Sequence, residues 1–229
     1  ALPSVAFLES SQEGTPRCAL SWSNEGLLVG QLARSLASSH SQACVQSAKS
    51  WLSYAGVDRR GAILPWGGSS EGAKYSPIQI SSAFLSHIRC AWDESFPGEQ
   101  LCEQEVVLTV PASFDDTARR LTVEAARLAG LSGPLFLIEE PQAAFYDQVN
   151  GCAESLRAGS LVLVVDVGGG TTDLTLIRCG GEGAEQSERF ERVAVGEHLL
   201  LGGDNMDLLL AYEAERRILG RNGSLNTRV

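Results

Sequence analysis

The sequence has little lysine and histidine and no cluster of positive charge. Its 229 residues include two lysines and three histidines, and the formal net charge is −10 at pH 7. An acidic chain without a basic cluster is a poor candidate for binding nucleic acid or a membrane surface. Long apolar runs are missing as well, and none approaches the length of a membrane-spanning helix. We therefore expect no nucleic acid and no membrane among the partners of this chain.

The cysteines and histidines are not spaced for a zinc site. The six cysteines include no C-x-x-C pair, and the three histidines are scattered along the chain. An even number of cysteines would permit disulfides, but ordinary spacing in a chain of this length favours reduced thiols. We therefore predict reduced, partly buried thiols and a cytoplasmic location.

Two widespread phosphate-binding motifs are also missing. The Walker pattern G-x-x-x-x-G-K-[ST] occurs nowhere in the chain. The dinucleotide fingerprint fails because Gly168-x-Gly170 is followed by Asp173 where a third glycine should stand. An apolar, β-branched run then follows where that fingerprint requires a helix. These observations exclude a P-loop and a Rossmann dinucleotide site.

A different glycine-rich segment, LVLVVDVGGGTTDLTL, lies at 161–176. Its continuous apolar start, Leu161–Val165, predicts a strand buried on both faces, and Leu174–Ile177 fits a partner strand. The glycines between them, Gly168–Gly170, can adopt positive φ and leave space for an incoming group. Successive exposed N–H groups in such a turn form a concavity that binds anions. The segment therefore predicts a hairpin with an anion site at its turn.

Two acids, Asp166 and Asp173, flank this turn. Carboxylates ~5 Å apart across a hairpin repel by about 3 kcal/mol at an effective dielectric constant of ~20. A hydrated Mg²⁺ between the carboxylates turns this repulsion into a net attraction, because Mg²⁺ prefers carboxylate oxygens, waters and phosphate together. The hydroxyls of Thr171 and Thr172 can donate to a phosphate oxygen or orient a water. The segment predicts a magnesium–phosphate site, and a plain glycine-rich hairpin with solvated acids is the alternative.

Outside this segment, strand-like and helix-like patterns alternate, which is typical of an α/β protein with a mixed sheet. A helix is expected after Ser76, which is a good N-cap and is followed by a proline at the first helical position. Its expected apolar face consists of Ile80, Phe84, Ile88 and Trp92. Further helices are expected at 30–38, 116–130, 141–149 and 205–219. Strands are expected at 4–10, 18–22, 62–66, 105–110, 135–139 and 190–195.

Several blocks together resemble the ATPase domain of the DnaK-type, seventy-kilodalton heat-shock chaperones. The blocks are VVLTVPASFDDTARRLTVEAARLAGL, LIEEPQAAF and VVDVGGGTTDLTLI, and their order and spacing also match. Residues 28–52 resemble the family's segment with its catalytic lysine, and LLGGDNMD (200–207) resembles its later glycine pair. The resemblance implies an actin-like, ribonuclease-H-like α/β fold with mixed sheets, in which two lobes close on Mg-ATP. In this incomplete copy, 1–159 would belong to the first lobe and 160–229 would begin the second.

The resemblance also implies a role for individual residues. Asp166 and Asp173 would hold Mg²⁺ through water, and Glu140 would lie near the metal and the attacking water. Lys49 would stabilise the γ-phosphate, and Thr171 would lie near the transferred group. The implied ATP/ADP phosphate contacts are Gly168, Gly169, Gly170, Thr171, Thr172, Gly202 and Gly203. Pro111 and Arg119 match positions that relay the nucleotide state to the rest of the chaperone.

Each of these residues also has a simpler interpretation. Lys49 would by default be a solvated surface lysine, but the chain otherwise uses 16 arginines and only Lys74 besides. A compact ammonium can contact one phosphate oxygen and one water, which favours the functional role. Glu140 could be an acid that complements a helix dipole. Pro111 and Arg119 could be a strand-ending proline and an exposed helix arginine.

Departures from the family affect the expected activity. Glu139 stands where the family usually has asparagine, and Thr172 replaces an aromatic residue. The family's first phosphate hairpin, adenosine segment, linker and peptide-binding domain are not in the chain, so we expect little ATP affinity from it alone. Client peptides and co-chaperones would bind regions outside it. Two alternatives stay open: a phosphotransferase of the sugar-kinase type, and a non-catalytic nucleotide sensor or scaffold.

Overall fold

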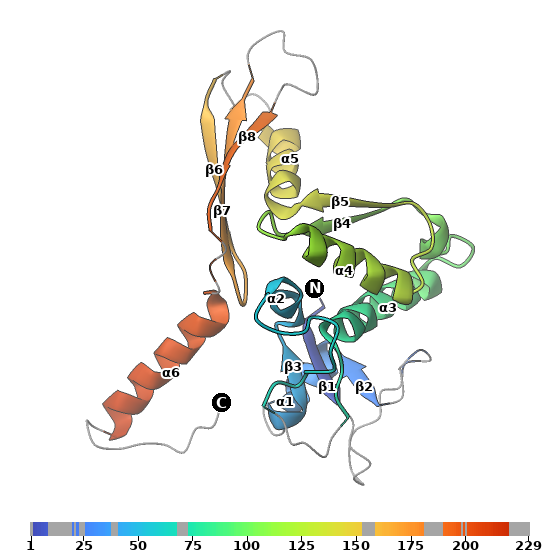
Figure 1. The fold of residues 1–229 in the computed structure, drawn as a ribbon, viewed down its shortest axis with the longest axis vertical. Coiled ribbons are helices and arrows are strands. Elements are labelled where there is room, and N and C mark those ends of the chain that lie inside the picture. The colour runs from blue at the N-terminus through green and yellow to red at the C-terminus, as the bar shows by residue number, and fades with distance from the viewer. Residues whose placement is uncertain are drawn as a thin grey trace. The chain divides into compact units, whose positions relative to one another are not determined.

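The chain forms two compact units. The computed structural model describes residues 2–8, 20, 22, 26–37, 41–67, 73–152, 159–180, 190–197, 199 and 201–219. The first unit comprises the described residues of Ala1–Leu108 and Asp115–Phe136, and the second those of Thr109–Phe114 and Leu137–Val229. Figure 1 labels the helices and strands of both units. The predicted lobe boundary after residue 159 is a different division and stays a prediction.

The first unit contains a small antiparallel sheet with β1 (Val5–Leu8) at its centre. β2 (Leu27–Val29) and β3 (Cys44–Gln46) flank it. α1 (Gln31–Ala37) follows β2, and α2 (Ala48–Ser53) follows β3 (Figure 1). The main core of this unit consists of Ala6, Leu8, Leu27, Val45, Ala48, Leu64, Ile80 and Ala83. The sheet thus holds α2 in place through Ala48, which is 2% exposed.

The longest helix of the first unit, α3 (Pro77–Ser95), starts where the sequence predicts. The Ser76 hydroxyl accepts from the Gln79 N–H at 3.2 Å, and the Gln79 side chain accepts from the Ser76 N–H at 2.8 Å. This reciprocal capping satisfies two N–H groups that have no partner inside the helix. The expected apolar face is only partly right, because Ile80 is fully buried whereas Ile88 is 47% exposed.

α4 (Asp116–Leu128) packs along α3 in the same unit. Its N-cap, Asp115, accepts from the Ala118 N–H at 2.6 Å, and the helix ends before Gly130, which has a φ of +88°. Glycine adopts this left-handed conformation without steric cost, and a left-handed residue at this position ends the helix. β4 (Val106–Val110) and β5 (Leu135–Glu139) pair with each other, and the chain passes between the units within both strands.

The second unit contains an antiparallel sheet in chain order. Its strands are β6 (Leu161–Val167), β7 (Thr172–Cys179) and β8 (Phe190–Val195). α5 (Glu140–Cys152) packs on this sheet through a small core of Phe145, Ile177 and Cys179 (Figure 1). α6 (Gly203–Leu219) begins at the turn between β6 and β7. None of the described helices is long and apolar enough to cross a membrane.

The expectation that β6 is buried on both faces is wrong for this chain. Burial alternates along the strand, and one face carries four exposed apolar side chains: Leu161 (55%), Leu163 (58%), Val165 (54%) and Val167 (50%). No described element covers this face. An unbroken apolar run shows that both faces can be buried, but it does not show what covers each of them.

Most other predicted elements are confirmed, with shifts of a few residues at their ends. The strand predicted at 62–66 is wrong, because this segment makes only an isolated bridge between Leu64 and Tyr75, followed by a cis Leu64–Pro65 bond. The sequence did not predict the three-residue strands β2 and β3 or the short helix α2. Most of the predicted strand at 18–22 lies outside the described residues. Among the described cysteines, Cys90, Cys102 and Cys179 have free thiols, and the predicted reduced state of the six cysteines stays a prediction.

Candidate functional site

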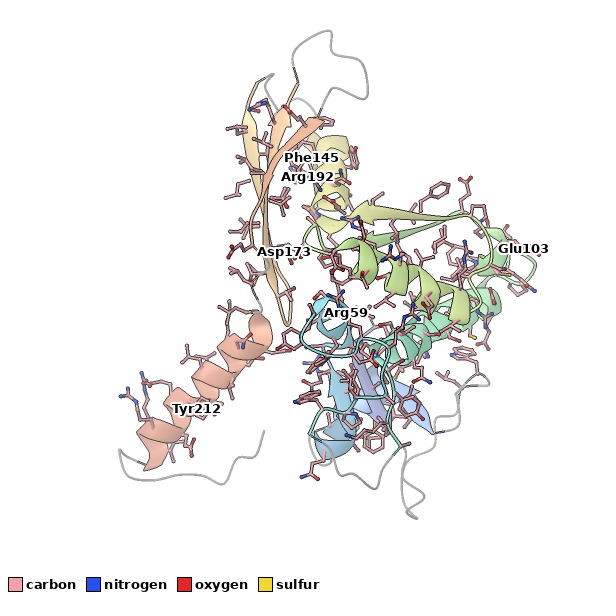
Figure 2. The ribbon with its side chains drawn as sticks, viewed as in Figure 1. Arg59, Glu103, Phe145, Asp173, Arg192 and Tyr212 are labelled. Atoms are coloured by element: carbon pink, nitrogen blue, oxygen red, sulfur yellow. The ribbon has the colours of Figure 1, made fainter. Side chains whose placement is uncertain are left out.

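The two acids of the glycine hairpin face each other across the ladder. Asp166 is the register partner of Asp173. Directly opposed residues of an antiparallel pair carry their side chains on the same face, so both carboxylates lie on one side of the hairpin. Asp173, labelled in Figure 2, is 5% exposed, and Asp166 is half-buried. The predicted pair of neighbouring acids is therefore present.

The turn between them presents a row of backbone donors. The Gly168 N–H donates to the Thr171 carbonyl at 2.8 Å and closes the turn. Within the described residues, the N–H groups of Gly169, Gly170 and Thr171 donate to no protein acceptor. Three successive N–H groups without a protein partner are suited to binding an anion.

Close packing explains the glycine at 202, whereas a Cβ on Gly168 or Gly169 would meet its nearest atom at an ordinary 3.5 Å or 3.8 Å. Neither Gly168 nor Gly169 has a positive φ, so that part of the expectation is wrong. The start of α6 lies directly on the turn, with Gly203 N–H donating to Gly168 O at 2.9 Å and Asp204 N–H to Gly169 O at 2.8 Å. A Cβ on Gly202 would lie 2.5 Å from Gly169 O. The glycines predicted to contact phosphate, in the turn and at the start of α6, are thus brought together.

Thr172 stabilises the same region through two contacts. Its hydroxyl donates to the Leu201 carbonyl at 2.7 Å, and its backbone pairs with Leu199. A hydroxyl has one proton to donate, so this contact competes with the predicted donation to phosphate. Thr171, one residue earlier, is half-buried.

Ser113 contacts the site from a segment that the sequence did not assign to it. Its hydroxyl donates to Asp173 Oδ1 at 2.9 Å. The turn Pro111–Phe114 that carries Ser113 is closed by a hydrogen bond from Phe114 N–H to Pro111 O, and both of these residues are buried. A serine inside a family block gives no signal of such a contact, because its partner lies 60 residues away in the sequence.

Glu139 and Glu140, at the end of β5 and the start of α5, have different surroundings. Glu139 is 7% exposed, and its Oε2 pairs with the Arg192 guanidinium of β8 as an ion contact rather than a well-aligned hydrogen bond. Figure 2 shows Arg192 beside Phe145, and both line a pocket of about 20 Å³ with room for about one water. Glu140, the predicted catalytic acid, is half-buried in the first turn of α5. The sequence indicated an added charge at 139 but not the arginine that balances it.

The donor set at the turn fits a hydrated magnesium ion with phosphate. Within the described residues, no group of three or more histidine, cysteine or acidic side chains could hold a metal ion by itself. Two carboxylates on one face match Mg²⁺, which keeps several waters and commonly uses one or two carboxylates together with phosphate oxygens. Asp166 and Asp173 are the residues that would hold it.

Comparison with known proteins identifies the family. The sequence pattern of the family described as Hsp70 protein matches residues 4–218. The chain belongs to the Hsp70 family. Its actin-like ATPase fold class and its place in the Hsp70 nucleotide-binding domain are thereby confirmed.

Relatives of this Hsp70 chain include several proteins named chaperone protein HscA homolog. Those of Methylibium petroleiphilum and Haemophilus influenzae (strain PittGG) are each 40% identical, over 70% and 73% of this chain. That of Vibrio vulnificus (strain YJ016) is 35% identical over 84% of this chain. The matched regions make up 23%, 24% and 31% of these three relatives, so the chain spans less than a third of their length.

Two residues of this Hsp70 chain with predicted functional roles, Lys49 and Arg119, lie in the first unit. Lys49 is the second residue of α2, and its side chain is exposed. The N-cap of this helix, Ser47, has a φ of 54° and a ψ of 32°, a left-handed conformation that is uncommon outside glycine and often marks a functional segment. Arg119 is half-buried on α4, and Pro111, in the second unit, is fully buried. The roles of Lys49, Arg119 and Pro111 stay predictions.

Proposed function

We propose that the protein carrying this chain binds Mg²⁺-ATP at the glycine turn and hydrolyses it to control the binding of client peptides. The observation that carries this proposal is the row of N–H groups at Gly169, Gly170 and Thr171 beside the opposed acids Asp166 and Asp173. Donors for phosphate and carboxylates for its cation lie at one end of one hairpin. Membership in the Hsp70 family supports the same chemistry.

Each group at the turn contributes to positioning or to charge stabilisation. In phosphoryl transfer to water, the water attacks the γ-phosphorus in line, the bond to the β-phosphate oxygen breaks, and ADP leaves. The turn N–H groups would hold the phosphates and stabilise charge that develops on their oxygens. A bound magnesium ion would supply further charge neutralisation at the phosphates. Asp166 and Asp173 would orient the waters around that ion.

Three side chains would position the attacking water. The Lys49 ammonium would contact a γ-phosphate oxygen and the water, Glu140 would accept a hydrogen bond from the water, and Thr171 would lie beside the transferred group. These roles require a cation, an acid and a hydroxyl, and the chain supplies one of each at positions that match the family pattern.

Asp204 provides a further argument for a metal-bound phosphate. A Cβ placed on Gly169 would lie 3.8 Å from Asp204 Oδ1, so this carboxylate lies close to the turn. A negative charge beside the donors disfavours a bare anion and favours one that brings its own cation. The acid also complements the N-terminus of α6, where the helix dipole favours negative charge.

The proposed function also implies binding partners, a relay to them and a cellular location. Client peptides and co-chaperones would bind regions outside this chain, and Pro111 and Arg119 would relay the nucleotide state to them. The free thiols of Cys90, Cys102 and Cys179 agree with a reducing, cytoplasmic location.

The test uses the full-length protein and its two lysines of this region. Lys49→Ala should abolish magnesium-dependent ATP turnover while nucleotide binding survives. Lys74→Ala is the matched control, because Lys74 is also an exposed lysine of the first unit, and it should leave turnover unchanged. Phosphate release and ATP affinity should be measured for both variants beside the wild type.

Other outcomes of this test point to the alternatives. ATP binding by the wild type without turnover would favour a nucleotide sensor or scaffold. ATP consumption that depends on an added sugar would favour a phosphotransferase. Equal loss of turnover in the two lysine variants would argue against a specific role for Lys49.

A further inference from the structure

The hydrogen bond from Ser113 to Asp173 joins two distant segments of the second unit. The Ser113 Oγ–Asp173 Oδ1 distance is 2.9 Å, a normal length for a hydroxyl donating to a carboxylate. Ser113 lies in the turn Pro111–Phe114, whose first residue is less than 2% exposed and whose last is 4% exposed. The backbone that presents the hydroxyl is therefore held by burial at both ends of the turn.

Asp173 needs such a donor. A carboxylate that is 5% exposed has lost most of its contact with water, and an unsatisfied buried charge is costly. A hydroxyl that donates to an ionised carboxylate makes a charge-assisted bond, which is stronger than a neutral one. The bond also fixes one oxygen of the acid and thereby limits rotation of the carboxylate plane.

We propose that Ser113 is a positioning residue that orients the Asp173 carboxylate for magnesium-bound phosphate; this inference rests on the proposed function. Groups that orient metal ligands commonly change metal affinity when they are removed, although they touch neither metal nor substrate. Ser113 acts through Asp173 in this way. Because α4 begins two residues after Phe114, the same bond attaches the segment that leads into α4 to the acid at the metal site.

The experiment measures the magnesium requirement of the full-length protein. ATP binding is titrated with Mg²⁺ at fixed ATP in the wild type, Ser113→Ala, Ser113→Thr and the control Ser95→Ala. Ser95 also donates a hydroxyl hydrogen bond, to the Ala91 carbonyl of α3. The urea midpoint of each variant is measured in parallel, because a purely structural role would lower the midpoint without changing the magnesium requirement.

The expected result is specific to the hydroxyl. Ser113→Ala should raise the Mg²⁺ concentration for half-saturation roughly tenfold, the lower end of the effect for groups that orient metal ligands. Ser113→Thr keeps the hydroxyl and should restore a near-wild-type value, and Ser95→Ala should not differ from wild type. Ser113→Gly serves as a second variant without the hydroxyl if the alanine variant does not fold.

Two results would overturn the inference, and they differ in what else they overturn. A wild-type protein that binds ATP with magnesium, together with an unchanged magnesium requirement in Ser113→Ala or Ser113→Gly, removes the role of Ser113 and leaves the proposed function intact. A wild-type protein whose ATP binding does not depend on magnesium removes both.

Discussion

Arg59 binds the Asp115 carboxylate through both of its terminal nitrogens. Nη1 lies 2.9 Å from Oδ1, Nη2 lies 3.0 Å from Oδ2, and Nε donates to the Tyr54 carbonyl. The Arg59 side chain is 11% exposed, so it is held more firmly than most surface arginines. Asp115 also caps α4 through the Ala118 N–H. One carboxylate therefore joins the loop after α2 to the first turn of α4, within the first unit.

Removal of this carboxylate should weaken the first unit. Asp115→Ala loses both the cap and the ion pair, and we expect a loss of about 1–2 kcal/mol in the free energy of unfolding. Asp116→Ala, in the first turn of the same helix, is the control and should cost less than about 0.5 kcal/mol. The four tryptophans of this chain lie between residues 22 and 92, so their fluorescence during urea unfolding reports on this unit. Equal losses of unfolding free energy in the two variants would show that the contacts of Asp115 do not stabilise the first unit.

The same ion pair predicts a dependence of stability on pH. The hydrogen bond from Arg59, followed by that from the Ala118 N–H, lowers the pKa of Asp115 in the folded chain. The stabilisation is therefore present above the unfolded pKa of about 3.9 and is lost as pH falls through the lower folded pKa. Arg59→Met should raise the pKa of Asp115 toward its ordinary value and make unfolding less dependent on pH below about pH 4. Urea midpoints between pH 2.5 and 6 measure this, and parallel curves for wild type and variant would contradict it.

Local patterns in the sequence were sufficient to predict the hairpin and the start of α3. The residues between Leu161 and Ile177 combine β-branched runs with a glycine turn, and this pattern sets the register that opposes Asp166 to Asp173. Ser76 and the proline after it likewise determine their helix start through contacts within four residues. Such features depend on neighbours in the chain, so the sequence alone was enough to predict them.

Contacts between distant segments could not be predicted in this way. The partners of Ser113 and Glu139 come from β7 and β8, and no periodic pattern links residues so far apart. The exposed face of β6 is a second example, because apolar residues such as Leu163 look the same in the sequence whether or not another element covers them. The role of Gly202 in close packing also required the fold, since glycine is equally compatible with a simple loop.

The Glu139–Arg192 pair should be strongly coupled. Arg192→Met removes the positive charge beside Glu139, whose side chain is 9% exposed. Because the Arg192 side chain is 43% exposed, we expect a loss of about 1–3 kcal/mol in the free energy of unfolding rather than the full cost of a buried pair. Glu139→Gln combined with Arg192→Met should recover part of that loss, because no buried charge then remains at 139. The control is Arg178→Met, since the Arg178–Glu191 pair is exposed on both sides and should contribute at most about 1 kcal/mol. Unfolding followed by circular dichroism gives the free energies of the wild type, Glu139→Gln, Arg192→Met, the double variant and Arg178→Met, and strictly additive losses at 139 and 192 would rule out the coupling.

Gly202 and Gly203 should respond differently to the same substitution. A Cβ on Gly202 would lie 2.5 Å from Gly169 O and 2.6 Å from Gly168 O, so Gly202→Ala must push α6 away from the phosphate turn. We expect it to lower stability by about 1–3 kcal/mol, and to weaken binding of a fluorescent ATP analogue because the turn is displaced. A Cβ on Gly203 would meet its nearest atom at 3.7 Å, an ordinary contact, and alanine is favoured over glycine in a helix by about 0.5–1 kcal/mol. Gly203→Ala should therefore lose no stability, and an unchanged stability in Gly202→Ala as well would mean that the close approach of α6 does not shape the phosphate turn.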